Sequence, residues 1–192
     1  MSRTAALREL SRPLFERQAG AKLGFMPFFV KAAAKGLRAC PEANAMLTPG
    51  GLFVHGRIHM GISIPTPHGV AVPVIRDPDL KPVYQIALEI ADLTRRGRLG
   101  LIRPEECSGS TFGVTNSGTL GIKRGVPMVI PPHTATLACA SIEKRPVVVG
   151  DRLEIRPVME ASLSFDHRAM DGDGPQRFFR AFKDSLEQAQ FT

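Results

Sequence analysis

The amino-acid sequence predicts an α+β fold with a mixed β-sheet and helices packed on one face. Apolar residues recur at helical spacing in some segments and alternate with polar residues in others, and the two patterns are interspersed along the chain. The 192 residues, 43% of them apolar and 22% charged, suit one domain with a substantial buried core. We therefore expect residues 1–192 to form a single domain without internal repeats or linkers.

Four segments have apolar residues at helical spacing and are expected to form helices. They span residues 4–18, 27–40, 82–95 and 174–188. Pro13 lies inside the first segment, so we expect a kink or a break there. Pro27 favours the first turn of the second helix, and Pro41 ends that helix because it lacks an N–H donor and restricts the residue before it.

The other apolar segments are expected to be strands. They span residues 52–55, 57–64, 70–75, 111–116, 136–143, 147–149, 153–157 and 161–166. Within residues 58–64 every second residue is apolar, which is the period of a half-buried strand. The turn at residues 67–69 predicts that this strand and residues 70–75 form a hairpin. Residues 150–151, Gly and Asp, predict a second tight turn.

The charge balance excludes some classes of partner. The formal net charge is +7, from 25 Lys and Arg against 18 Asp and Glu. A basic surface attracts phosphates, but one Tyr and no Trp leave no aromatic platform for nucleic acid. No run approaches the roughly 18 apolar residues of a membrane span, and the first residues begin an amphipathic segment rather than a secretion signal. We expect no nucleic acid or membrane partner, and a location in the cytoplasm or a mitochondrial matrix.

The strongest candidate for chemistry is the segment of residues 166–172, which follows an apolar strand. Strand ends place catalytic side chains at the surface on a rigid support. His167 has an imidazole suited to a general base near neutral pH, and Asp166 and Asp171 are placed to orient it or to pair with Arg168. From the residues alone, catalysis and a structural Asp–Arg–Asp pairing both remain open.

A second candidate lies at the end of the strand 111–116. Thr115, Asn116 and Ser117 offer hydroxyl and amide donors that can stabilise an oxyanion. The alternative is a turn rich in side-chain-to-backbone hydrogen bonds, which these residue types also favour. The glycine-rich residues 118–125 lack the Gly-Lys-Ser/Thr ending of a phosphate-binding loop. Four histidines have no metal-ligand spacing and are expected to be isolated: His55, His59, His68 and His133.

Four short motifs follow one another along the chain. Residues 25–32 read FMPFFVKA, 66–77 read TPHGVAVPVIRD, 112–118 read FGVTNSG and 166–172 read DHRAMDG. Together they resemble the catalytic domain of dihydrolipoamide acyltransferases, the E2 components of 2-oxo acid dehydrogenase complexes. The family patterns are F-x-P-F-x-x-K-A, T-P-x-G-L-x-V-P-V-I-R-D, F-T-I-S-N-x-G and D-H-R-x-x-D-G. The similarity extends from about residue 7 to about residue 186.

The resemblance implies a fold shared with chloramphenicol acetyltransferase and an acyl transfer between dihydrolipoamide and coenzyme A. It implies that His167 is the general base, that Thr115 stabilises the oxyanion at a position where the family has Ser, and that Asp171 positions the loop. It also implies a site between subunits of a homotrimer, which further assembles into a cubic core, and no metal. The lipoyl domain and the E1 and E3 components are the implied partners.

The sequence departs from the family in two respects. We expect the N-terminal helix and strand of the family, with an arginine that pairs with the aspartate at position 171, to be missing. We also find no lipoyl domain and no peripheral-subunit-binding domain, so the lipoyl group is expected on a separate domain or chain. A catalytically impaired assembly module and an acyltransferase with another acceptor are the alternative functions. The sequence identifies neither the acyl group nor the residues that bind coenzyme A.

Overall fold

The computed structural model describes residues 1–191, in which four α-helices pack against a β-sheet. The helices are α1 (Ser2–Ala19), α2 (Met26–Ala39), α3 (Val83–Arg98) and α4 (Asp173–Gln188). The strands are β1 (Ala45–Thr48), β2 (Gly51–Val54), β3 (His59–Ile62), β4 (Ile64–Thr66), β5 (Gly69–Ala71), β6 (Val74–Arg76), β7 (Phe112–Asn116), β8 (Ala135–Val149) and β9 (Arg152–Phe165). Short 3-10 helices are η1 (Pro41–Asn44), η2 (Pro104–Cys107) and η3 (Ser117–Leu120).

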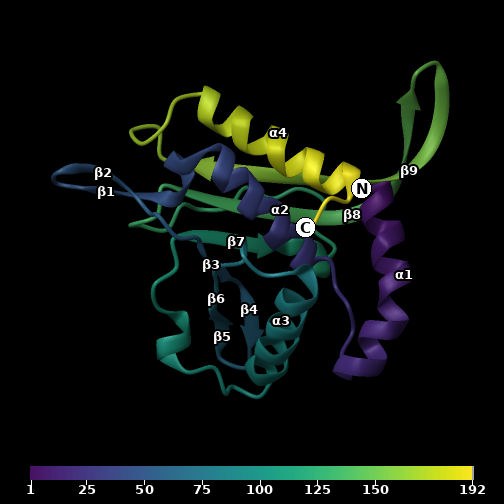
Figure 1. Ribbon diagram of the computed structural model, residues 1–192, viewed down its shortest axis with the longest axis horizontal. Coiled ribbons are helices and arrows are strands. Elements are labelled where there is room, and N and C mark those ends of the chain that lie inside the picture. The colour runs from purple at the N-terminus through teal and green to yellow at the C-terminus, as the bar shows by residue number, and fades with distance from the viewer. Residues whose placement is uncertain (192) are drawn as a thin grey trace.

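The main sheet is mixed, with the strand order β6-β3-β7-β8-β9. The pairs β3–β7 and β7–β8 are parallel, whereas β3–β6 and β8–β9 are antiparallel. Two smaller hairpins, β1–β2 and β4–β5, extend from the body, and the β1–β2 hairpin reaches far to one side (Figure 1). The prediction of a mixed sheet is confirmed.

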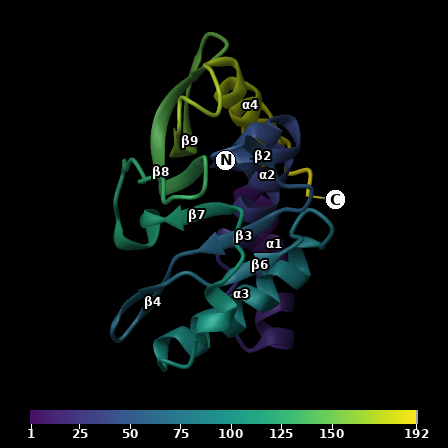
Figure 2. The same cartoon turned by 90° about the vertical axis from the view of Figure 1, so that its left-hand side faces the viewer.

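The helices lie on one side of the main sheet, as predicted (Figure 2). Helices α2 and α4 pack against each other over the centre of the sheet, and α1 and α3 lie beside them (Figure 1). A single cluster of buried apolar side chains fills the space between helices and sheet, and it includes Phe29, Phe112 and Phe178. No helix within residues 1–191 is long and apolar enough to cross a membrane.

Proline at position 13 does not break the first helix. Helix α1 runs without interruption from Ser2 to Ala19, and Pro13 is exposed on it. A proline on the solvent side of a helix loses one hydrogen bond where water can replace the partner, so the helix tolerates it. Gly20 then ends the helix in the left-handed conformation, with φ of 61°.

The strands differ from the predicted ones mainly in length and continuity. The predicted hairpin of residues 58–64 and 70–75 exists, but its strands are interrupted, the first of them at exposed Ser63. The result is two strand pairs, β3–β6 and β4–β5. The four predicted strands between residues 136 and 166 join into two long ones. Strands β8 and β9 form one antiparallel hairpin, with a register irregularity between Cys139 and Ile142 and the predicted turn at Gly150.

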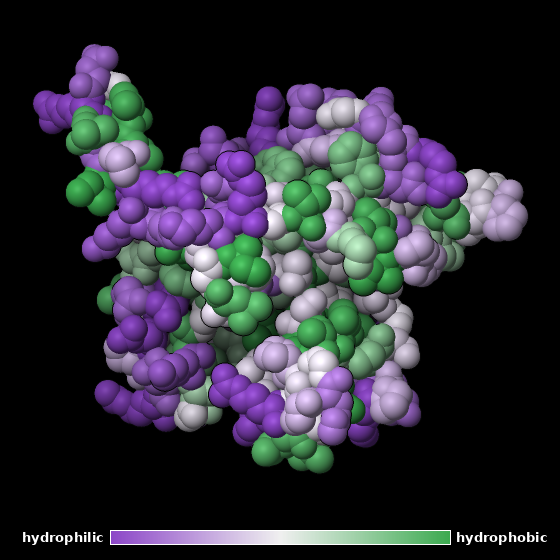
Figure 3. Space-filling view, turned by 180° about the vertical axis from the view of Figure 1, so that it is seen from behind, coloured by the Kyte–Doolittle hydropathy of each residue, from purple (hydrophilic) through white to green (hydrophobic). Residues whose placement is uncertain are grey.

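The outer part of the β8–β9 hairpin projects beyond the body of the molecule (Figure 1). Its residues pair only with each other, because β7 pairs with β8 no further than Cys139. Val148, Leu153 and Ile155 are each about three quarters exposed there. In the view from behind, the surface of the projection shows hydrophobic side chains among hydrophilic ones (Figure 3).

Candidate functional site

The candidate catalytic histidine lies in a short loop, residues 166–172, between β9 and α4. The loop is fixed on both sides of His167. Before it, the N–H of Asp166 donates to the carbonyl of Thr134, the residue that precedes β8 (2.8 Å), and after it, Ala169 and Met170 are buried. His167 itself is exposed. An exposed imidazole on a rigid support can accept a proton from a substrate that reaches it.

Asp166 and Arg168 form an ion pair on either side of His167. The guanidinium Nε and Nη2 of Arg168 donate to the carboxylate of Asp166 at 3.0 and 2.6 Å, and the backbone N–H of Arg168 donates to it at 2.9 Å. These hydrogen bonds lower the pKa of Asp166 to about 2. The carboxylate is therefore ionised and occupied by its neighbour two residues on, which fixes the backbone on both sides of the histidine.

Asp171 has a different role from Asp166. Its Oδ1 accepts the backbone N–H of Asp173 at 3.2 Å, at the start of α4. A carboxylate at this position satisfies a free N–H of the first helical turn and is favoured by the helix dipole. The expected Asp–Arg–Asp pairing is thus only half present: Arg168 pairs with Asp166, whereas Asp171 positions the end of the loop by a hydrogen bond.

Thr115 lies on β7 and faces away from the helices. Phe112 and Val114 are 0% and 2% exposed in the core beneath the helices, so the alternation of a strand turns Thr115 and Gly113 to the opposite face. The neighbours of Thr115 on that face are small: Ala138 on β8 and, beyond it, Ser162 on β9.

The turn after Thr115 uses its polar groups locally. Asn116 accepts the N–H of Gly118 (3.0 Å), the hydroxyl of Ser117 donates to the carbonyl of Cys139 (3.3 Å), and that of Thr119 donates to the carbonyl of Asn116 (3.2 Å). For Asn116 and Ser117 the structure thus favours the turn over the oxyanion reading. The hydroxyl of Thr115 is not held by such bonds within the part of the chain that the structure describes.

Strand register places Thr115 and the start of the histidine loop at different levels of the sheet. Thr115 is level with Ala138 and Ser162 in the sheet, whereas the histidine loop begins after Phe165, which is level with Ala135. Three residues along a strand and two strand spacings across separate the start of the loop from Thr115 by about 14 Å. Two contacts of about 3 Å each to one reacting carbonyl span less than half of that separation.

The four other histidines are not all isolated, contrary to expectation. The Nε2 of His133 donates to the carbonyl of Ser110 at 2.9 Å, and His59 lies 3.8 Å from the carboxylate of Asp77. The pKa of His55 is lowered by burial and by the nearby His133 and His59. Long-range pairing brings these residues together, which spacing along the chain could not show. No group of three or more metal-ligating side chains within residues 1–191 could hold a metal ion.

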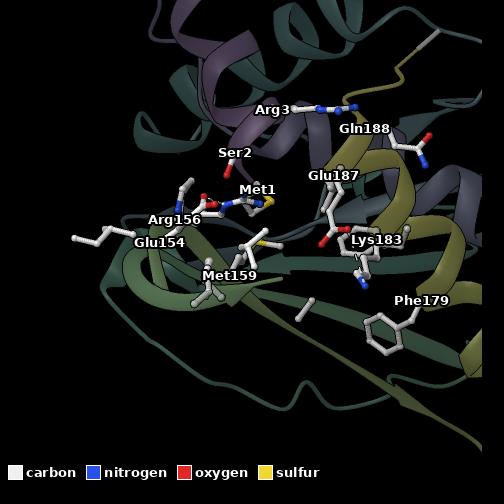
Figure 4. A pocket seen from close by; sticks show the side chains of 18 residues that line it. Met1, Ser2, Arg3, Glu154, Arg156, Met159, Phe179, Lys183, Glu187 and Gln188 are labelled. Atoms are coloured by element: carbon white, nitrogen blue, oxygen red, sulfur yellow. Dashed lines mark hydrogen bonds and ion pairs between the residues drawn. The ribbon is translucent and has the colours of Figure 1, made fainter. Parts of the chain in front are cut away.

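A cavity of about 1140 Å³ lies at another place in the fold. It opens between the start of α1, the middle of β9 and one side of α4, and Met1, Met159 and Phe179 line it (Figure 4). Lys183 and Glu187 on α4 stand at its edge across from Glu154 and Arg156 (Figure 4). Neither residues 112–118 nor residues 166–172 line it, so this cavity is separate from the candidate site.

Two solved structures with this fold are dihydrolipoamide acetyltransferases. A probable dihydrolipoamide acetyltransferase from Listeria monocytogenes superposes with a TM-score of 0.92 at 31% identity, over 96% of this chain and 79% of that one. The dihydrolipoamide acetyltransferase of Azotobacter vinelandii gives the same TM-score and identity over 98% of this chain and 78% of its own. The α+β prediction and the expected resemblance in fold to dihydrolipoamide acyltransferases are confirmed.

The chain belongs to the 2-oxoacid dehydrogenases acyltransferase (catalytic domain) family, whose model matches residues 1–192. It is 36% identical to the acetyltransferase component of the pyruvate dehydrogenase complex from Corynebacterium glutamicum, over 100% of this chain and 29% of that protein. It is 35% identical to the succinyltransferase component of the 2-oxoglutarate dehydrogenase complex from Haemophilus influenzae, over 94% of this chain and 44% of that protein. The chain thus spans less than half the length of either relative.

Proposed function

We propose that this chain is the catalytic domain of a dihydrolipoamide acyltransferase, which moves an acyl group between the thiol of dihydrolipoamide and coenzyme A. The observation that carries the proposal is the exposed His167, held in a loop fixed by Asp166 and Asp171. Membership of the acyltransferase family and relatives that are acetyl- and succinyltransferase components support it. Both kinds of relative are about equally similar, so the acyl group is left to experiment.

In the proposed reaction, the imidazole of His167 takes the proton from the attacking thiol. The thiolate adds to the carbonyl carbon of the thioester, and the carbonyl oxygen becomes an oxyanion. The bond between that carbon and the departing sulfur then breaks, and the imidazolium returns the proton to the departing thiolate. General base catalysis of this kind contributes about 10²–10⁴-fold to the rate.

Thr115 is the proposed donor to the oxyanion, because its hydroxyl is not used by local hydrogen bonds. The study of the Azotobacter vinelandii enzyme names a serine, a histidine and an asparagine in its catalytic mechanism. That serine and histidine are 52 positions apart, as are Thr115 and His167, and the asparagine follows the histidine by four positions, as Asp171 follows His167. The matching spacing supports the three proposed roles, with Thr for Ser and Asp for Asn.

The separation along the sheet between Thr115 and the start of the histidine loop supports a site built from two copies of the chain. One copy would supply His167 and the neighbouring copy Thr115, in a homotrimer that assembles into a larger core. A solved relative is the cubic core of the pyruvate dehydrogenase multienzyme complex, with a TM-score of 0.92. We further propose that a lipoyl domain carries the acyl group to this site, and that E1 and E3 components complete the assembly.

The first experiment measures acyl transfer to dihydrolipoamide with acetyl-, succinyl- and isobutyryl-coenzyme A in parallel. We expect turnover with at least one donor and a loss of about 10²–10⁴-fold in His167→Ala. Unchanged turnover in that variant would refute the role of His167. No turnover by a folded oligomer with any donor would instead favour an assembly module, and turnover only with other acceptors would indicate a different acyltransferase.

A complementation experiment tests whether the site is shared. His167→Ala and Thr115→Val are each expected to lose at least about 10²-fold in activity. Co-expression would place intact His167 of one copy beside intact Thr115 of another. Random mixing restores roughly a quarter of the sites if each site takes one residue from each of two copies. No recovery from mixed oligomers would contradict the shared site.

A further inference from the structure

Thr134 is a buried residue at which three parts of the chain meet. It is 0% exposed and directly precedes β8. Its N–H donates to the carbonyl of Ala45 (3.1 Å), and its hydroxyl donates to the carbonyl of Glu42 (2.7 Å). Its own carbonyl accepts the N–H of Asp166 (2.8 Å). Every polar group of Thr134 therefore has a partner. The partners lie in β1, in η1 and at the start of the histidine loop.

The bond between Thr134 and Asp166 is the last rung of the β8–β9 ladder. The preceding pair is Ala135 with Phe165, and beyond Asp166 the chain turns into the histidine loop. Terminal rungs open most easily, because only one side of them is supported by further pairing. The carboxylate of Asp166 accepts the backbone N–H of Arg168. Because His167 lies between these two residues, the position of Asp166 determines where its backbone lies.

The acceptor of the Thr134 hydroxyl is itself firmly placed. Glu42 lies in η1, and Arg177 of α4 donates to its carboxylate (3.4 Å) and to the carbonyl of Ala39 (2.9 Å). Two residues on, Asn44 is 3% exposed and donates to the carbonyl of Arg57 (2.9 Å). The hydroxyl of Thr134 thus connects the end of the sheet to a rigid turn.

We propose that Thr134 is a positioning residue for His167. By donating to Glu42, its hydroxyl keeps the carbonyl of Thr134 aligned for Asp166 and thereby holds the start of the histidine loop in place. The inference rests on the proposed function, in which His167 is the general base. A base must lie within hydrogen-bond reach of the thiol, so a small displacement of the loop lowers the rate of the chemical step more than substrate binding.

The test compares variants that differ by one hydroxyl. Thr134→Val keeps the shape of the side chain but removes the donor, and we expect kcat to fall about 10- to 100-fold. We expect the KM for coenzyme A to stay within about twofold, because the substitution removes no contact that binds the substrate equally in the ground state and the transition state. Thr134→Ser keeps the donor and should restore most of kcat.

Thr136→Val is the matched control. Thr136 lies two residues further along β8 and is 7% exposed, and its buried hydroxyl has no hydrogen-bond partner within the described residues. The same change there removes no bond, so kcat should remain that of the wild type. An equal fall in kcat in both variants would mean that the effect comes from the packing of β8, and it would overturn the proposal. A wild-type kcat in folded, oligomeric Thr134→Val would overturn it as well.

Amide exchange of Asp166 provides a readout that does not depend on activity. Exchange at this amide should be about tenfold faster or more in Thr134→Val, because the rung that protects it opens more often, and unchanged in Thr136→Val. If His167→Ala keeps full activity while this difference appears, the role of His167 fails but the support of its loop by Thr134 stands. An unchanged exchange rate in Thr134→Val would refute the inference itself.

Discussion

Gly118 is the position at which a single methyl group should disturb the Thr115 side of the site. It lies in η3 directly against the backbone of β8. A Cβ there would meet the carbonyl oxygen of Ala140, and would lie 2.6 Å from the carbonyl carbon of Ala140 and 2.7 Å from the nitrogen of Ser141. All three atoms are backbone atoms at the register irregularity of β8 between Cys139 and Ile142, so η3 and this part of β8 must move apart. Reaching ordinary contact at about 3.5 Å requires a shift of nearly 1 Å.

The expected cost of Gly118→Ala follows from that shift. Overpacking of this kind costs about 1–3 kcal/mol, and about 2 kcal/mol corresponds to a fall in Tm of about 4–8 °C for a chain of this length. Thr115 lies only three residues before Gly118, so a shift of about 1 Å should also lower kcat by up to about 10²-fold. Thermal unfolding and the acyl-transfer assay measure the two effects separately.

Gly125→Ala is the control for this prediction. A Cβ at Gly125 would meet the hydroxyl of Ser117 at 3.6 Å and the side chain of Ile122 at 3.9 Å, which are ordinary contacts. Its effect on stability should remain within about 0.5 kcal/mol. Wild-type Tm and kcat in Gly118→Ala, or equal changes in the two variants, would refute the reasoning from close approach.

Two further predictions concern single side chains. Thr115→Val should lower kcat by about 10²–10³-fold because it removes the oxyanion donor, whereas Thr115→Ser should stay active; an active Thr115→Val would exclude this role. Glu106 accepts two hydrogen bonds from Arg96 (2.8 and 2.6 Å), which together with the N–H of Arg103 lower its pKa from 4.5 to about 2. Its stabilisation is therefore complete above pH 4.5 and lost as the pH falls towards 2. Urea unfolding of Glu106→Gln should show a loss of about 1 kcal/mol at pH 7 that shrinks by pH 3, and a loss independent of pH would contradict this.

Local patterns predicted the helices and most of the strands, because apolar periodicity records which face of an element is buried. Buried Ile58, Met60, Ile62 and Ile64 confirm the alternation read in that segment. The continuity of β8 and β9 could not be predicted in the same way. Pro146 and Pro157 interrupt the apparent strands, yet each is paired across the hairpin, with Ile155 and Lys144. Pairing between strands, rather than the propensity of either one, carries the ladder past the prolines.

The assignment of the site residues stays a prediction from the motifs, and the site between subunits stays an expectation from the family resemblance. The motifs identified His167, Asp171 and Thr115, whereas the separation of Thr115 from His167 depends on strand register and direction, which no local pattern contains. Thr134 carried no sequence signal at all. A threonine after Pro-Pro-His is ordinary in composition, and its importance arises only from the three segments that fold around it.

The two halves of the β8–β9 hairpin differ in how they can fluctuate. The inner half shares its edge with β7 and lies under α2 and α4, so breaking it means breaking the core. Among residues 1–191 no other strand pairs with the outer half, and its side chains Val148, Leu153 and Ile155 face water. Local opening there costs far less free energy than global unfolding. We therefore expect slow amide exchange in the inner half and faster exchange in the outer half of the same hairpin, on either side of the register irregularity between Cys139 and Ile142.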